Sequence, residues 1–277
     1  MMYVLNRAAN APLSEPMGGE ARLVKQIAHY HTQREVSPKV YRLYLQAADL
    51  PEMDRQAILG YRVAAILGYA PAQTALGEYY EYGPKPDMAK AAHLYLTAAE
   101  QGYGPAQGHV ALCYLLGEGV EADAEKAAEW AAAGEKQGSA EAQFAHGAAL
   151  LLKADTEEAR NAASAYLFEA LSQYFGKELF LDLFLQTNDE TIRALQAGAQ
   201  EGKAVAEASL GLLCTMGVKD APAMGAKEII QLLRHALRPG DTPAKLRAQM
   251  PGVDSCSKEK MQEWLKKTAD AEEKQTA

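Results

Sequence analysis

A repeated stretch decides the fold of this chain: residues 68–107 read GYAPAQTALGEYYEYGPKPDMAKAAHLYLTAAEQGYGPAQ. Its opening Gly-Tyr-Ala-Pro-Ala-Gln, from Gly68, returns as Gly-Tyr-Gly-Pro-Ala-Gln from Gly102, and in weaker forms from Gly138 and Gly202. The first three starts are 34 and 36 residues apart, and the last gap of 64 residues has room for two units, one of them shortened. A period of this length predicts stacked helix pairs, because each pair buries its apolar face against the next pair.

The composition supports a purely helical chain. Alanine supplies 53 of the 277 residues, whereas Val, Ile and Thr together supply only 26. Alanine is the best helix former and lets helices approach closely, while β-branched residues favour strands. We therefore expect an all-α fold, an α/α superhelical solenoid of stacked antiparallel helix pairs, and we exclude a β-sandwich, a barrel and a Rossmann sheet.

Each unit divides into the same parts. A first helix carries Leu76-Gly77, a glycine-bearing loop follows, and a second helix opens at Asp87 or, one unit later, at Asp123. Both aspartates are placed to cap a helix by accepting bonds from backbone N–H groups that have no partner within it. The second helix ends in Ala98-Ala99-Glu100-Gln101 before a glycine, which indicates a C-cap. The small Ala98-Ala99 pair predicts a close helix–helix seam.

This pattern resembles the Sel1-like repeat, a relative of the tetratricopeptide repeat. The resemblance is carried in the clearest copy by Ala72-Gln73, Leu76-Gly77, Tyr80, Asp87, Lys90-Ala91 and Ala98–Gly102, and in the next by Gly117–Val120, Asp123, Lys126-Ala127 and Trp130. The sequence departs from the pattern where Val110-Ala111 replaces Leu-Gly and where His146-Gly147 half-replaces it. The third copy lacks the glycine loop and reaches its second helix through Lys153–Asp155, and residues 174–201 fit only as a degenerate unit.

The repeats suggest four segments along the chain. We expect a flexible leader over residues 1–18, N-terminal capping helices and a degenerate repeat over 19–67, the Sel1-like array over 68–240, and C-terminal capping helices over 241–277. Residues 40–49 and 56–67 are predicted to be the two helices of the degenerate unit. In a solenoid the terminal units turn a polar face outward, which suits the polar helix predicted from about residue 255 to 274.

Charge and motifs exclude several classes of function. The formal net charge of -8 speaks against nucleic-acid binding, and no apolar run approaches the ~20 residues that membrane insertion requires. Three cysteines are too few for a disulfide scaffold and favour a reducing, cytoplasmic setting. The sequence contains no His-Glu-x-x-His, Cys-x-x-Cys, Walker or Gly-x-Ser-x-Gly motif, so we expect no catalytic residues, no metal and no cofactor.

The first helices suggest where a partner would bind. If Ala72, Leu76 and Tyr80 face the core at 100° per residue, the opposite side of each first helix lines the concave face of the stack. That side is mostly apolar and suits a helix or peptide of another protein. The predicted partner-binding residues are Thr74, Glu78, Tyr82, His109, Leu112, Leu116, Phe144, Leu152, Leu212 and Met216. The alternative is that these residues contact neighbouring first helices or a terminus folded over them.

The resemblance implies a non-enzymatic scaffold or adaptor that holds a partner protein or peptide segment in its concave groove. A bacterial regulatory adaptor and an immunity protein that neutralises an effector are both compatible with it. The alternatives are a hydrolase acting on cell-wall precursors or β-lactams and a structural self-associating subunit, and the oligomeric state stays open. Penicillin binding and hydrolysis belong to a cysteine-rich branch of the family whose paired cysteines this sequence lacks.

Overall fold

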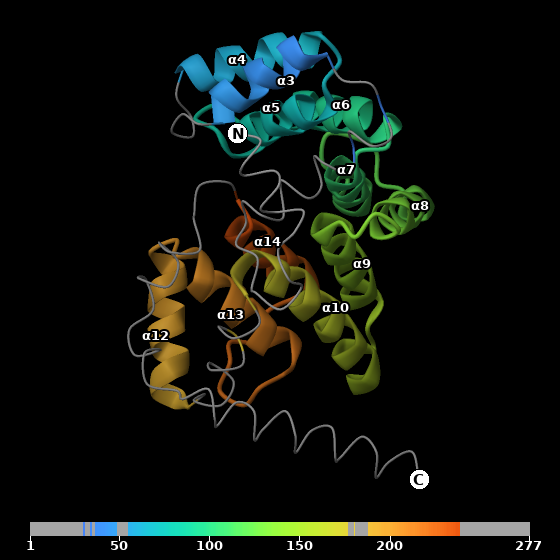
Figure 1. The fold of residues 1–277 in the computed structure, drawn as a ribbon. Helices are drawn as coiled ribbons and strands as arrows, with labels where there is room; N and C mark the ends of the chain where they lie inside the picture. The colour runs from blue at the N-terminus through green and yellow to red at the C-terminus, as the bar shows by residue number, and fades with distance from the viewer. Residues whose placement is uncertain are drawn as a thin grey trace, which may run out of the picture.

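The computed structural model describes residues 30, 34, 37–48, 55–176, 180 and 188–238. Within these ranges the regular secondary structure is entirely helical, as the alanine-rich composition predicts (Figure 1). The helices are α3 (Pro38–Ala48), α4 (Arg55–Ile66), α5 (Ala70–Tyr82), α6 (Met88–Glu100), α7 (Gly104–Leu116), α8 (Ala124–Glu135), α9 (Ala140–Lys153), α10 (Glu157–Phe175), α12 (Asp189–Gln200), α13 (Ala204–Thr215) and α14 (Ala226–Ala236). None of the helices in the described ranges is long and apolar enough to cross a bilayer.

The helices are arranged as consecutive pairs stacked into a solenoid. Contacts join α3 to α4, α5 to α6, α7 to α8, α9 to α10 and α13 to α14, and further contacts join each of the first four pairs to the next. Figure 1 shows these pairs following one another along a curved path, with α3 and α4 at one end. The last described pair, α13–α14, stacks on the pair before it through contacts of α14 with α9 and of α13 with α10. The predicted fold class is confirmed.

Polar side chains begin the second helices, as the sequence predicts for two of them. The carboxylate of Asp87 accepts a bond from the Lys90 backbone N–H, and that of Asp123 accepts bonds from the N–H groups of Glu125 and Lys126. In the third unit the connection through Lys153–Asp155 leads to Thr156, whose hydroxyl caps α10 at its start, Glu157.

Glycine ends the second helices for a conformational reason. Gly102 and Gly138 have φ values of 81° and 69°, in the left-handed region that glycine adopts without a steric penalty. At Gly102 the following N–H, that of Tyr103, donates to the carbonyl of Ala98, which is the bond that closes a Schellman motif. A Cβ at either glycine would meet nothing within 4 Å, so backbone geometry rather than space requires glycine here.

Small residues line the seams between helices. Ala98 and Ala99 are 0% and 1% exposed, so the predicted close contact is confirmed. One apolar cluster runs from α3 to α7, and a second runs from α7 to α14. Helix α7, the first helix of its unit, contributes to both clusters. Val110 and Cys113 belong to the first cluster, and Ala111 and Leu112 belong to the second.

A ladder of glutamine side chains joins the units. In each of three units the side-chain amide at the end of the second helix donates to the amide oxygen near the start of the first. These bonds are Gln101 to Gln73 at 2.7 Å, Gln137 to Gln107 at 2.8 Å and Gln173 to Gln143 at 2.6 Å. Gln73 and Gln107 also donate back to the preceding unit, to the carbonyls of Ala65 and Ala99. The repeated Ala-Gln of the sequence is therefore a hydrogen-bonded joint.

The segments outside the repeats are only partly described. Helices α3 and α4 occupy the positions predicted for the two helices of the degenerate unit before residue 68, and α12 lies within the degenerate stretch 174–201. The predicted leader over 1–18 and the capping helices over 241–277 lie outside the described residues. The four segment boundaries stay predictions.

Candidate functional site

The predicted partner-binding face consists of four rows of residues, each row defined by one equivalent position in the first helices α5, α7, α9 and α13. In the row nearest the helix starts, Thr74 and Phe144 are buried. In the second row His109 is buried, and in the third row Leu112 and Leu212 are buried and Glu78 is half-buried. In the last row Tyr82, Leu116 and Leu152 are half-buried and Met216 is 43% exposed. Only the last row, here called the edge row, offers apolar surface in every one of the four units.

The buried rows are filled by the protein itself. Leu112, Phe144 and Leu212 belong to one apolar cluster with Ile230 and Leu233 of α14. Thr74 is also buried, and His109 is 9% exposed. These five residues therefore offer almost no surface to a partner in this conformation. The physical reason is that a first helix packed on both sides is apolar all round, so periodicity alone does not separate a core face from a binding face. The assignment of Glu78 and the edge row to a binding surface stays a prediction.

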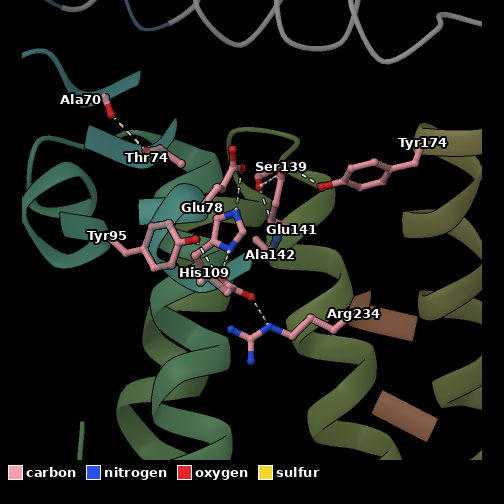
Figure 2. A network of polar contacts seen from close by, with 11 residues as sticks. Ala70, Thr74, Glu78, Tyr95, His109, Ser139, Glu141, Ala142, Tyr174 and Arg234 are labelled. Atoms are coloured by element: carbon pink, nitrogen blue, oxygen red, sulfur yellow. Dashed lines mark hydrogen bonds and ion pairs between the residues drawn. The ribbon is translucent and has the colours of Figure 1, made fainter. Parts of the chain in front are cut away.

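A buried ionic network lies beside these rows, between α5, α7 and α14. The Nε atom of Arg234 lies 2.9 Å from Oε1 of Glu81 as an ion pair, although its N–H is not aligned for a hydrogen bond. The same guanidinium pairs with Glu118 in the loop between α7 and α8. Tyr95 donates to Oε2 of Glu81 at 2.7 Å. Figure 2 shows Arg234 approaching from a different helix than Tyr95 and His109.

The histidine of this network is enclosed by carboxylates. The His109 ring stacks on that of Tyr95 at 4.3 Å between centroids, and its Nε2 lies 3.5 Å from Oε1 of Glu78 (Figure 2). Burial alone would lower the pKa of His109, but Glu78 and Glu81 outweigh it, so the net pKa is raised. Burial alone would raise the pKa of Glu81, but Arg234 and His109 outweigh it and lower that pKa. The network therefore favours charged side chains within the protein.

The last unit replaces the glutamine joint with a glutamate and a histidine. Glu207 follows Ala206 as Gln73 follows Ala72, and its Oε1 lies 2.7 Å from Nδ1 of His235. The side chains of Glu207 and His235 are 28 residues apart in sequence, as are those of Gln73 and Gln101. In the sequence this joint is indicated only by Ala206-Glu207, a weak copy of the repeated Ala-Gln. No comparable signal marks Glu81, Glu118 and Arg234, because their contacts join positions far apart in the chain.

The chemistry of these groups is that of a structural network. The contacts of His109 in the described part of the chain are with Glu78, Glu81 and Tyr95, which hold a charged imidazole rather than activate a nucleophile. Burial raises the pKa of the Cys113 thiol to about 12 and that of Cys214 to about 11, so both are protonated at neutral pH. Among the described residues, no three His, Cys, Asp or Glu side chains form a metal-binding group.

Comparison with known proteins places the repeats in a family. Residues 70–103 and 104–139 each match the Sel1 repeat. A 92-residue stretch is 40% identical to chitin synthase regulatory factor 3 of Schizosaccharomyces pombe, covering 31% of this chain and 10% of that protein. The chain thus spans about a tenth of the length of the curated relative that it matches.

Two solved structures are similar at low sequence identity. A Sel1 repeat protein from Oxalobacter formigenes is 20% identical with a TM-score of 0.41, over 96% of this chain and 74% of that one. A protective antigen with an SLR fold from uropathogenic Escherichia coli strains is 20% identical with a TM-score of 0.40, over 97% and 60%. Both matched repeats coincide with observed helix pairs, α5–α6 and α7–α8. On the matched repeats and their helix pairs, residues 70–139 of the chain form two Sel1 repeats.

Proposed function

We propose that this protein is a non-enzymatic adaptor that binds a partner protein against the edge row, Tyr82, Leu116, Leu152 and Met216. Sel1 repeat proteins are typically protein-interaction scaffolds, which gives the general class. The observation that carries the proposal is that large side chains at one equivalent position in four units keep exposed surface, while the rows beside them are mostly buried. A line of such positions suits an amphipathic helix or an extended peptide.

A role in regulation is favoured over a role in catalysis. The matched relative from S. pombe is named a regulatory factor, which supports an adaptor that acts by binding. The thiols of Cys113 and Cys214 are unpaired, which supports the reducing, cytoplasmic setting that we include in the proposal. The hydrolase alternative would need a nucleophile beside a base, and the carboxylate contacts of His109 favour a structural role.

The test compares partner recovery by the wild type and by an edge-row variant. We expect affinity purification from native lysate, followed by mass spectrometry, to recover a stoichiometric partner with the wild type. The triple variant Leu116→Ser/Leu152→Ser/Met216→Ser should lose it. The control is Tyr166→Ser, because Tyr166 is a large side chain on α10 that is 40% exposed and lies outside the edge row. A partner that the folded triple variant retains would show that the edge row is not the binding surface.

A further inference from the structure

The exposed face of α4 carries an apolar stripe, defined as Leu59, Val63, Ile66 and Leu67. Their exposed fractions are 58%, 46%, 85% and 56%. They are four of the six large apolar side chains that stand exposed in the described part of the chain. Single exposed apolar residues are ordinary on a protein surface, whereas a concentrated patch indicates an interaction site.

The stripe is continuous because of its helical spacing. Val63, Ile66 and Leu67 follow Leu59 by four, seven and eight residues, which places all four on one side of the helix. Leu67 continues the last turn, since its N–H donates to the carbonyl of Val63. The buried side of α4 carries Ala57, Ala64 and Ala65. Ile58 and Tyr61 also pack partly against the core, whereas the four residues of the stripe point away from it.

The repeat itself does not require apolar residues at these positions. Gly68, Gly102 and Gly138 end the second helices of three successive units with the same left-handed backbone, so their helices can be compared in register. The positions that match the stripe are His93, Thr97, Glu100 and Gln101 in α6, and Glu129, Ala133, Lys136 and Gln137 in α8. Since α6 and α8 pack as second helices with mostly polar residues there, the stripe on α4 serves something other than the stack.

One edge of the stripe is basic. Arg55 and Arg62 are exposed and seven residues apart, which places them along the same side of α4 next to Ile66. No acidic residue occurs within α4. Arg62 donates to the hydroxyl of Tyr80 at 3.0 Å, and Asp87 nearby is paired with Lys90 at 2.7 Å. The positive charge along this edge therefore lacks a carboxylate on the helix itself.

We propose that the exposed face of α4 is a second docking surface, which binds an amphipathic helix of another protein that carries acidic residues along one edge. From Leu59 to Leu67 the stripe is about 12 Å long, which corresponds to two to three turns of a partner helix. A second copy of this chain is a poorer occupant. An antiparallel pair of α4 helices about a two-fold axis would place the two arginine edges against each other. This surface is separate from the edge row, and the proposal does not depend on it.

The probe is a synthetic stapled helix of 14 residues with leucines at i, i+4 and i+7 and glutamates along one edge. A matched peptide carries lysine in place of each glutamate. Fluorescence anisotropy should show the acidic peptide binding at least tenfold tighter than the basic one, with the difference shrinking in high salt. The double variant Arg55→Glu/Arg62→Glu should reverse that preference.

A matched control separates the stripe from a general effect of added charge. Val63→Glu/Ile66→Glu should weaken binding of the acidic peptide at least tenfold, whereas Ala133→Glu/Lys136→Glu, at the same register of α8, should leave it unchanged. Equal binding of the two peptides, or normal binding by the folded Val63→Glu/Ile66→Glu variant, would overturn the proposal. The proposal would also be overturned if the wild type sedimented as a dimer and the Val63→Glu/Ile66→Glu variant sedimented as a monomer. The edge-row triple variant should bind the peptide normally, which distinguishes failure of this proposal from failure of the proposed function.

Discussion

At the scale of the residue, the first and second helices of a unit fit by pairing small residues with large ones. A Cβ added to the glycine of the Leu-Gly pair would meet a buried side chain of the facing helix. The closest distances are 2.5 Å for Gly77 against Tyr95, 2.9 Å for Gly147 against Leu167 and 2.4 Å for Gly211 against Leu233. In the second unit the corresponding positions hold Ala111 and Ala131, both in the core. The departure from Leu-Gly at Val110-Ala111 is thus matched by a smaller residue opposite.

The fit can be tested by coupling the two positions in the last unit. Gly211→Ala should lower the free energy of unfolding by about 1–3 kcal/mol through overpacking, although alanine favours the helix. Leu233→Ala should lower it by about 2–5 kcal/mol through a cavity. In urea unfolding, the double variant should lose less than the two single losses added together, because the new methyl group fills part of the cavity. Strict additivity would show that the two positions do not contact each other.

The raised pKa of His109 has a consequence for stability. Glu78 and Glu81 favour the charged imidazole in the folded protein more than water does in the unfolded chain. The stability contributed by this group is therefore fully present below the ordinary histidine pKa of about 6.5 and is lost as pH rises through the raised folded pKa.

We expect the variant His109→Gln to remove this dependence. Urea unfolding of the wild type at a series of pH values from 6 upward should show the free energy of unfolding decreasing relative to that of the variant. The control is His93→Gln, which changes an exposed histidine on α6. Parallel pH profiles for the wild type and His109→Gln would contradict the assignment of a charged His109.

At the scale of the element, the glutamine ladder explains why Ala-Gln recurs. Gln107 accepts from Gln137 and donates to the carbonyl of Ala99, so one side chain joins the two helices of its own unit to the unit before it. A buried carbonyl or amide without such a partner carries the full cost of losing its water. The joint therefore fixes the register between neighbouring helix pairs.

Replacing one side chain of the ladder should destabilise the stack. Gln107→Leu leaves the amide of Gln137 without its partner and removes the bond that ties the carbonyl of Ala99 to the next unit, so it should cost about 1–3 kcal/mol. Gln231→Leu makes the same replacement on the exposed side of α14 and should change stability by less than about 0.5 kcal/mol. Urea unfolding measures both free energies. Equal effects of the two substitutions would show that the ladder does not hold the units together.

The elements could be predicted from local sequence, and the ion pairs could not. Asp87 and Asp123 cap helices through bonds to residues two or three positions further on, and Gly102 follows a helix end. Because these signals are local and repeat with the period of the units, the helix pairs could be predicted. The sequence does not predict which side of each first helix is covered within the protein and which side is open to a partner. Phe144 and Leu112 look alike in sequence whether a partner or α14 covers them, and α14 is more than 80 residues away. Among the predicted residues, Glu78 and the edge row at the helix ends keep accessible surface.

At the scale of the whole molecule, Arg234 closes the curved stack. It lies on α14, in the last described unit, and pairs with Glu81 on α5 and with Glu118 after α7. The sequence predicts a superhelical solenoid with a concave face, and it does not indicate where the last unit lies relative to the first. In the structure, the end of the array returns to the first full repeat and the two form a buried ionic contact.

Breaking this contact should be costly. Arg234→Met removes the cation nearest to the buried Glu81 carboxylate and should lower the free energy of unfolding by about 3–5 kcal/mol. Adding Glu81→Gln should recover part of the loss, because a neutral amide still accepts the bond from Tyr95. Hydrogen exchange should increase mainly in α14 and at the end of α5, and Arg193→Met, on the exposed side of α12, is the control. An unchanged exchange pattern in Arg234→Met would show that the contact does not hold the stack closed.

The closure also sets an order of events during synthesis on the ribosome. Arg234 is translated 153 positions after Glu81, which at ~10 residues per second is a delay of roughly 15 seconds. Throughout that interval the nascent N-terminal units hold an acidic group whose final counter-ion does not yet exist, so water must solvate it. The side of the early helix pairs that carries Glu81 therefore stays hydrated after synthesis, and it loses this water only when α14 packs against it.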